Sequence, residues 1–357
     1  SQLYDVEQTI VKPNSILEIK FDKPILDRVS DNPFLELNAL SFSFQENMEL
    51  MDILDNINKA RDHHNIKGIY LNVSSLEAGF SQVEEIRNKL LEFKKSGKFI
   101  YAYSESFSQN AYYLASAADK IYLNPEGYVE LYGISAGVMF YKDLLNKVGV
   151  EAQVIRHGKY KSAVEPYMYN AMSQDNREQL ERLLNSITNK IISDISYSRS
   201  VSETRIHEVM NKLELSSAYN AKDLLFIDEI YYEDEVMDRI NQEGSYNLIS
   251  YIDFERVNIV RDNLTEDKIA IIYAIGDINT GEGSFNSIGS ETIVKAIRKA
   301  KEDSNVKAIV LRVNSPGGSA LASDIIWREL SLAKKKKKVV VSMGDYAASG
   351  GYYISCN

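Results

Sequence analysis

Short apolar segments alternate with amphipathic ones through the first third of the chain. Apolar residues that recur at every second position, or run together, predict strands, and apolar residues with helical spacing predict helices. The expected strands are 15–21, 68–73, 99–103 and 120–123, and the expected helices are 49–62, 83–93 and 111–118. Strands that alternate with helices are typical of an α/β fold in which most strands pair in parallel.

The pattern becomes more helical after residue 137. It predicts a helix over 137–148, a strand over 151–155, a long amphipathic helix over 175–197 and two further helices within 203–240. Asp175, with Glu178 three residues later, has the spacing of a capping box and is expected to begin the long helix. Residues 156–167 are a polar loop without a clear period. Residues 241–267 are polar and weakly periodic, so we expect a linker there, followed by a strand from Ile269.

The chain also contains an internal repeat. Residues 53–116 align with residues 293–356 without a gap when 240 is added to each number. The matched pairs include Ile53 with Ile293, Ile57 with Ile297, Ile69 with Ile309, Leu71 with Leu311, and Tyr112 with Tyr352. Alternating strands alone do not produce one register across helices, strands and turns. The sequence therefore predicts two tandem α/β repeats, an N-terminal one over 1–255 and a C-terminal one over 256–357, with the second truncated.

The two repeats differ in a small set of serine and glycine positions. The corresponding pairs are Gly317 with Glu77, Gly318 with Ala78, Ser349 with Gln109, and Gly350 with Asn110. A requirement for the same scaffold does not explain why the differences fall there. The second repeat is therefore expected to carry chemistry that the first has lost.

Ser349 is the candidate nucleophile. It stands between small residues in A-A-S-G-G, where a β-branched strand turns into a helix, and such a turn exposes a serine beside backbone N–H groups. Taken alone, the segment also fits a tight packing turn. S-P-G-G follows the preceding strand, and consecutive parallel strands bring both turns to one edge of the sheet. Gly317 or Gly318, with the Gly350 N–H, can then donate to a carbonyl oxygen held over Ser349.

The general base is not defined by the pattern. His63, His64 and His207 are interpreted as surface residues, whereas His157 is a potential triad member without an evident acidic partner. A lysine that is enclosed enough to lose its proton is the alternative. Periodicity does not choose among the 41 lysines and arginines.

Composition excludes some classes of function. A net charge of −10 argues against nucleic acid as a partner, and the lysine run 334–338 is interpreted as a solvated helix end. The single Cys356 excludes an intrachain disulfide framework and a cysteine zinc cluster. No apolar run approaches the roughly 18 residues of a membrane-spanning helix. Since the chain begins with Ser1 rather than Met and ends inside an expected helix, we expect both ends to be cut.

Three motifs resemble the signal peptide peptidase A family, peptidase family S49, in its long, two-repeat form. They are G-K-Y-K-S-A-V-E-P at 158–166, V-N-S-P-G-G-S at 313–319 and A-A-S-G-G-Y-Y-I-S at 347–355. The resemblance covers nearly the whole chain. It implies the fold of the Clp-protease/crotonase superfamily and a catalytic serine/lysine dyad that needs no metal or other cofactor.

Carried onto this sequence, the resemblance makes Ser349 the nucleophile and Lys161 the general base. Lys159 does not occupy the position of the family's lysine. The first repeat would then supply the base and the second the nucleophile. Because Ala163, Val164 and Pro166 follow it, we expect Lys161 to be buried.

The resemblance further implies a serine endopeptidase that degrades hydrophobic peptides, notably cleaved signal peptides. It also implies a homotetramer and an N-terminal anchor in the bacterial inner membrane, with the catalytic domain on the periplasmic side. One alternative is a crotonase-type acyl-CoA enzyme, but that chemistry typically uses carboxylates rather than a serine. Another is a non-catalytic membrane-associated scaffold, against which the intact Ser349, Gly317 and Gly318 argue.

Overall fold

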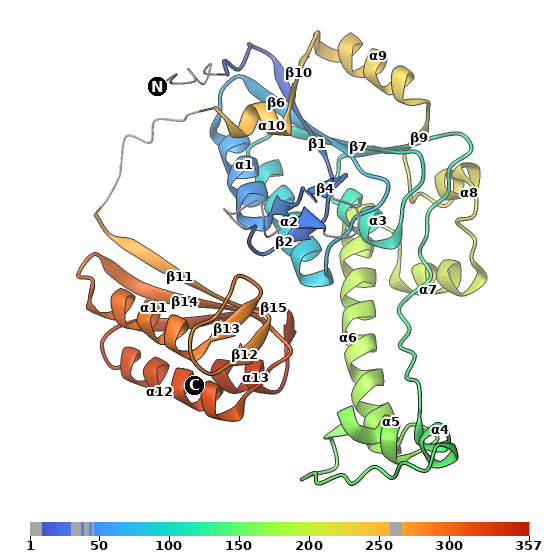
Figure 1. Cartoon of the computed structure of the whole chain (residues 1–357). Coiled ribbons are helices and arrows are strands. Elements are labelled where there is room, and N and C mark those ends of the chain that lie inside the picture. Colours follow the sequence, from blue (N-terminus) through green and yellow to red (C-terminus); the bar gives the residue numbers. More distant parts are fainter. Residues whose placement is uncertain (1–8, 30–36, 39–42, 45, 258–265, 357) are drawn as a thin grey trace. The chain divides into compact units, whose positions relative to one another are not determined.

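The structure is a computed structural model that describes residues 9–29, 37–38, 43–44, 46–257 and 266–356. It divides into two compact units (Figure 1). The larger unit contains the residues up to Ile100 together with those from Ile240 onward, and the smaller unit is Tyr101–Arg239.

The N-terminal part of the larger unit is built on parallel strands. Its elements are β1 (Ser15–Lys20), β2 (Ile25–Leu26), β3 (Leu37–Asn38), β4 (Ser43–Phe44), β5 (Met48–Glu49), α1 (Leu50–Asp62), β6 (Ile66–Asn72), α2 (Phe80–Lys94), β10 (Asn247–Ser250) and α10 (Tyr251–Glu255). β1 pairs in parallel with β10 on one side and with β6 on the other. The apolar faces that predicted α1 and α2 are buried, including Ile53, Ile57, Ile86 and Leu90.

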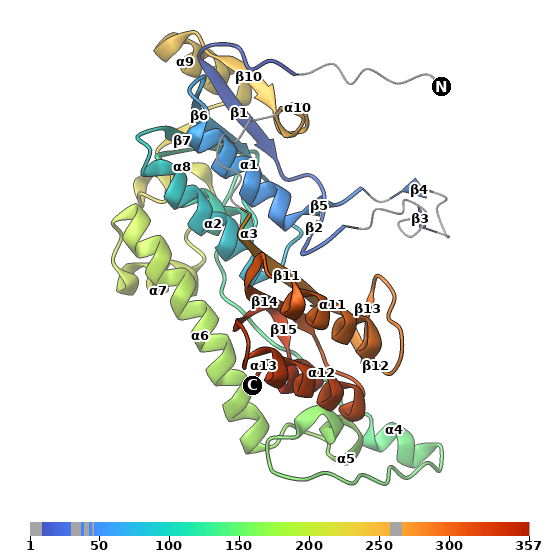
Figure 2. The same ribbon diagram turned by 90° about the vertical axis from the view of Figure 1, so that its left-hand side faces the viewer.

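The C-terminal part of this unit has its own three-stranded parallel sheet, in the order β11-β14-β15. Its elements are β11 (Lys268–Ile275), β12 (Asp277–Asn279), β13 (Ser287–Gly289), α11 (Ser290–Glu302), β14 (Val306–Ser315), α12 (Ala320–Ala333), β15 (Lys338–Ala347) and α13 (Gly350–Ser355). Helices α11, α12 and α13 lie side by side against the strands (Figures 1 and 2).

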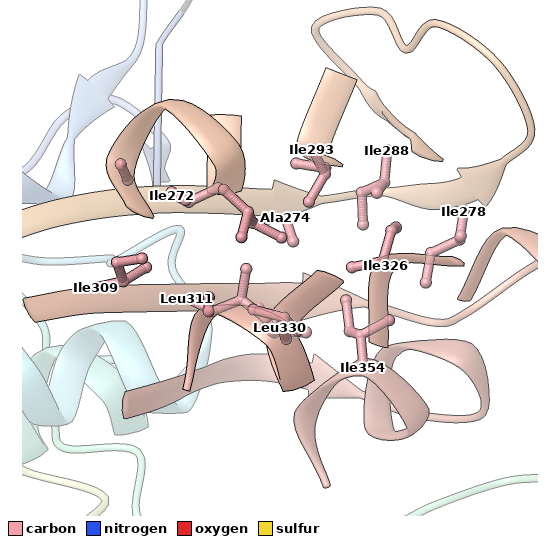
Figure 3. Packing of buried hydrophobic residues seen from close by; sticks show 14 of the residues in the cluster. Ile272, Ala274, Ile278, Ile288, Ile293, Ile309, Leu311, Ile326, Leu330 and Ile354 are labelled. Atoms are coloured by element: carbon pink, nitrogen blue, oxygen red, sulfur yellow. The ribbon is translucent and has the colours of Figure 1, made fainter. Parts of the chain in front are cut away.

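One continuous apolar core joins this sheet to its helices (Figure 3). Ile309 and Leu311 alternate along β14 and are fully buried, and Ile326 from α12 and Ile354 from α13 meet them. Burying one such side chain stabilises the fold by about 1.5–3 kcal/mol. Ile278, just after β11, belongs to the same core, so the core extends to the carboxyl edge of the sheet.

The smaller unit combines short parallel strands with helices. β8 (Lys120–Leu123) pairs in parallel with β7 (Phe99–Ser104), in which the division between the units falls, and with β9 (Glu229–Ile230). The helices are α3 (Gln109–Ala115), α4 (Lys142–Lys147), the 3₁₀ helix η2 (Ser162–Val164), α5 (Glu165–Met168), α6 (Gln174–Arg199), α7 (Glu203–Lys212) and α8 (Ala218–Asp223). The division between the units also falls within α9 (Glu233–Gly244). Both views show α5 near the N-terminal end of α6, and α4 packs against α5 (Figures 1 and 2).

The predicted α/β class with parallel strands is confirmed. The order helix, strand, helix, strand, helix also recurs: α1, β6, α2, β7 and α3 begin 240, 240, 240, 239 and 241 residues before α11, β14, α12, β15 and α13. This spacing supports the predicted repeat, which remains a prediction.

Three local predictions were wrong. Residues 151–155 form no strand, because Ile155 is exposed and these residues pair with no strand in the described part of the chain. Residues 258–265 of the predicted linker 241–267 lie outside the described residues, but its described part contains the end of α9 together with β10 and α10, since pairing with a strand more than 200 residues away leaves no local period. Helix α6 is capped by Ser173, whose hydroxyl accepts from the Asn176 N–H, rather than by Asp175.

The helical predictions after residue 137 were partly right. Only Lys142–Lys147 of the expected helix 137–148 is helical, and the region after α6 holds three helices rather than two. No helix in the described ranges is both long and apolar enough to cross a membrane.

Candidate active site

Ser349 occupies a strained turn between β15 and α13. Its backbone angles, φ 50° and ψ −116°, lie where residues other than glycine are rare and cost about 1–3 kcal/mol to hold. Ser349 is exposed, and its hydroxyl makes no N-cap hydrogen bond to α13. The turn therefore presents a serine side chain that the helix does not use, which is the geometry that a nucleophile at a strand-to-helix turn requires.

Neighbouring backbone groups fix this turn. The Ala348 N–H donates to the Ser315 carbonyl at 3.1 Å, and the Tyr353 N–H donates to the Ser349 carbonyl at 2.9 Å. A Cβ on Gly350 would lie 2.6 Å from Ser323 Oγ, which is closer than real contacts allow. The glycine after the serine is thus required for the packing of α13 against α12.

The S-P-G-G loop lies directly against the Ser349 turn. Gly317 has φ +106°, and a Cβ there would lie 2.5 Å from Gly350 N and 2.8 Å from Ser349 Cβ. Gly318 has φ +151°, and a Cβ there would collide with the Ile278 carbonyl. The structure thus brings Gly317, Gly318 and Gly350 together beside Ser349, at the carboxyl ends of β14 and β15.

The two loop glycines differ in whether their N–H groups are engaged. The Gly317 N–H donates to Ser315 Oγ at 3.1 Å, and the Ser315 hydroxyl donates to the Gly276 carbonyl at 2.6 Å. Within the described ranges, neither the Gly318 N–H nor the Gly350 N–H has an acceptor. Of the two alternatives that the sequence left open, Gly318 is therefore the better candidate donor.

Lys161 lies in the smaller unit, in the loop that ends at α5. The Arg156 guanidinium donates to the Lys161 carbonyl at 3.1 Å and to Glu165 Oε1 at 3.4 Å. Glu165 is fully buried and also accepts from the Ser173 hydroxyl at 2.6 Å and from Asn176 Nδ2 at 3.1 Å. The carboxylate of Glu165 therefore ties the lysine loop to the first turn of α6.

Hydrogen bonding outweighs burial at Glu165. Burial alone would raise the pKa of this carboxyl, but donors from Ser173, Asn176 and Arg156 hold its pKa below the usual value. The prediction that Lys161 is buried was wrong, since the structure has Lys161 exposed on the smaller unit. Glu165 is the buried residue of this segment instead, because its carboxylate has enough donors to be buried.

The competing bases have unsuitable surroundings. Lys159 Nζ lies 3.3 Å from Asp175 Oδ1, and this contact raises the pKa of the lysine, which favours its protonated form. His157 is exposed and has no carboxylate partner in the described part of the chain. His63 and His64 stack on each other, with ring centroids 5.1 Å apart, just after α1.

Gln109, the counterpart of Ser349, has a different use. Its Oε1 accepts from the Tyr132 N–H at 3.2 Å and from the Gly133 N–H at 3.0 Å. The side chain thus holds the backbone of the loop after β8, which gives this position a structural role. Sequence reasoning missed this role, because the two amides lie more than 20 residues away.

Comparison with known proteins identifies the family of this chain. Residues 92–247 match the model of peptidase family S49. Protease 4 of Salmonella typhi is 38% identical over 333 residues, which cover 89% of this chain and 53% of that protein. The chain belongs to peptidase family S49. The family resemblance expected from the three motifs is confirmed.

Two further S49-type relatives show similar coverage. Protease 4 of Haemophilus influenzae is 37% identical over 323 residues, or 85% of this chain and 52% of the relative. The chloroplastic serine protease SPPA of Arabidopsis thaliana is 35% identical over 331 residues, or 89% of this chain and 49% of the relative. This S49 chain therefore spans about half the length of the relatives that it matches.

Proposed function

We propose that this S49 chain provides the catalytic residues of a serine endopeptidase, with Ser349 as nucleophile and Lys161 as general base. The observation that carries the proposal is the strained, exposed Ser349 turn with two unengaged N–H groups beside it. The names of the relatives, Protease 4 and serine protease SPPA, support peptide hydrolysis.

The chemistry proceeds through an acyl-enzyme. The free amine of Lys161 takes the proton of Ser349 Oγ as the oxygen attacks the peptide carbonyl. The negative oxygen of the tetrahedral intermediate accepts from the Gly318 and Gly350 N–H groups, and a donor of this kind contributes roughly 10²–10³ in kcat. The lysine ammonium then protonates the leaving amine. A water molecule, deprotonated by the same lysine, then attacks the ester carbonyl, and the lysine ammonium returns the proton to Ser349 Oγ as the carboxylate product leaves.

Ser349 and Lys161 belong to different units, so the dyad requires that the units, or neighbouring chains, bring them together. We propose hydrophobic peptides as substrates, in particular signal peptides that have already been cleaved from preproteins. The membrane anchor, the periplasmic location and the homotetramer are part of the same proposal, and they rest on the resemblance.

Covalent labelling tests the proposal. A fluorophosphonate probe should modify full-length protein at Ser349, identified by peptide mass spectrometry, and should not modify a Ser349→Ala variant. The same protein should hydrolyse an apolar signal-peptide segment faster than a polar peptide of equal length. Labelling of another residue, or peptide hydrolysis by Ser349→Ala, would contradict the assignment.

A further inference from the structure

A buried ion pair links the two ends of the larger unit. Arg312 on β14 donates to Asp27 Oδ1 through Nη2 at 2.7 Å and through Nε at 3.1 Å, and the two residues are 6% and 4% exposed. Removing two charges from water is costly unless hydrogen bonds satisfy them well. Because the desolvation cost offsets much of the attraction between the two charges, a contribution to fold stability does not by itself account for this pair.

The remaining donors and acceptors of this pair are also used. Arg312 Nη1 donates to Glu85 Oε1 at 2.6 Å and to Ser342 Oγ at 2.9 Å. The second oxygen of Asp27 accepts from Asn314 Nδ2 at 2.6 Å. Asp27 thus holds two side chains of β14, two residues apart on the same face of the strand.

Asn314 extends this network to the segment that leads to Ser349. Its Oδ1 accepts from the Tyr346 N–H at 3.1 Å, so the amide connects Asp27 with the end of β15. The next residue, Ser315, accepts the Ala348 N–H through its carbonyl. Asp27, Asn314 and Tyr346 therefore form one chain of hydrogen bonds that ends three residues before Ser349.

A second contact holds the same segment. Asp345 Oδ1 accepts from the Ser81 N–H at 2.9 Å and from the Ser81 hydroxyl at 2.8 Å. Ser81 lies in the first turn of α2, where unpaired N–H groups and the helix dipole favour a carboxylate. Residues 345 and 346 are thus held from two separate places, by Asp27 through Asn314 and by Ser81. Both places belong to the part of the larger unit up to Ile100, called here the N-terminal segment.

The network is specific to the serine-bearing part of the chain. The positions 240 residues before Arg312, Asn314 and Asp345 hold Asn72, Ser74 and Glu105. The first repeat therefore has no guanidinium at the position of Arg312 and no amide at the position of Asn314.

We propose that Asp27 and Asn314 are positioning residues for the nucleophile: the N-terminal segment holds residues 345–346, and through them Ser349, in the attacking geometry. This inference rests on the proposed function. A strained turn relaxes unless its surroundings hold it, and a displacement of about 1 Å at a reacting atom costs roughly 100-fold in rate. The N-terminal segment would then contribute to catalysis as well as to the stability of the fold.

The test separates positioning from stability. In full-length protein, Asp27→Asn keeps the shape of the side chain, and Asn314→Ala removes the link to Tyr346 while leaving the ion pair intact. The matched control is Glu329→Gln, because Glu329 is a carboxylate 3% exposed that accepts from Arg298 and Lys301 without touching the Ser349 turn. Fluorophosphonate labelling, kcat and KM are measured below the melting transition of each variant.

We expect Asp27→Asn and Asn314→Ala to lower kcat and the labelling rate constant at least 10-fold, with KM changed less than threefold. Glu329→Gln should lose thermal stability and keep its labelling rate. If Asp27→Asn fails to fold, Asn314→Ala decides the matter. A folded Asn314→Ala protein with the wild-type labelling rate would overturn the positioning role alone. A wild-type protein that is not labelled at Ser349 would overturn the proposed function, and the positioning role with it.

Discussion

Replacing Gly317 by alanine tests whether the glycine loop and the serine turn act together. The added Cβ would lie 2.5 Å from Gly350 N and 2.8 Å from Ser349 Cβ. Both atoms belong to the Ser349 turn, and neither is the far end of a flexible side chain. The turn must therefore move, or the loop must withdraw from it.

The size of the movement follows from these distances. Ordinary van der Waals contact begins near 3.4 Å, so relief of the closest contact needs a displacement of about 0.9 Å. Misplacement of a reacting group by about 1 Å costs roughly 100-fold in rate. Alanine at φ +106° also adds about 1–3 kcal/mol of backbone strain. We therefore expect Gly317→Ala to lose about 100-fold in kcat/KM and a few kcal/mol in stability.

Gly97→Ala is the matched control. Gly97 has φ +80° in the turn between α2 and β7, and no atom would lie within 4 Å of a Cβ there. Alanine at this position carries backbone strain of about 1–2 kcal/mol but displaces no atom of the site. Thermal melting measures the stability of both variants, and hydrolysis of an apolar peptide measures kcat/KM. If Gly317→Ala retained more than a third of wild-type activity, the inferred contact between loop and turn would be refuted.

Three further predictions concern the lysine loop and the counterpart of the nucleophile. Lys161→Arg should fold normally and be as inactive as Lys161→Ala, because a guanidinium group stays protonated and cannot act as a base. Lys159→Ala should keep most of its activity. Peptide hydrolysis by the three variants is measured from about pH 6 to pH 10, and turnover by Lys161→Arg would show that another residue is the base. Gln109→Ser combined with Ser349→Ala should not hydrolyse peptides, because Glu77 and Ala78 replace the glycines that would bind the oxyanion; turnover by the double variant would contradict this. Because the pKa of Glu165 is lowered in the fold, its stabilising effect is complete above its ordinary pKa of about 4.5 and is lost as the pH falls through the lower folded value. Glu165→Gln should therefore lower the melting temperature at pH 7, and its melting temperature should fall less than that of the wild type as the solution is made acidic. An unchanged pH dependence of the melting temperature would contradict the role of this carboxylate.

The sequence was most informative where structure is local. The apolar period gave α1 and α2 within three residues at each end, and it located the strand before Ser349 and the helix after it. It also placed Gly317 and Gly318 at the same sheet edge as Ser349, since consecutive parallel strands share their carboxyl edge. These features depend on neighbours in the chain and on one simple rule of topology.

Long-range polar contacts were not predictable in this way. Asp27 and Arg312 are 285 positions apart, and neither has an unusual local pattern. Glu165 lies inside the motif at 158–166, but its burial depends on donors from Arg156 and from the start of α6. A carboxylate inside a short apolar segment was the one local signal that could have identified it.

The most direct measurement of the central claim is the separation of Ser349 Oγ and Lys161 Nζ in a crystal or cryo-EM structure of the full-length assembly. Because the two residues belong to different units of this chain, their meeting is the step on which the proposed dyad depends. We expect a distance of about 2.6–3.2 Å, somewhat longer without a bound peptide, within one chain or between neighbours. Two residues that lie far apart in every pairing of chains would contradict the dyad.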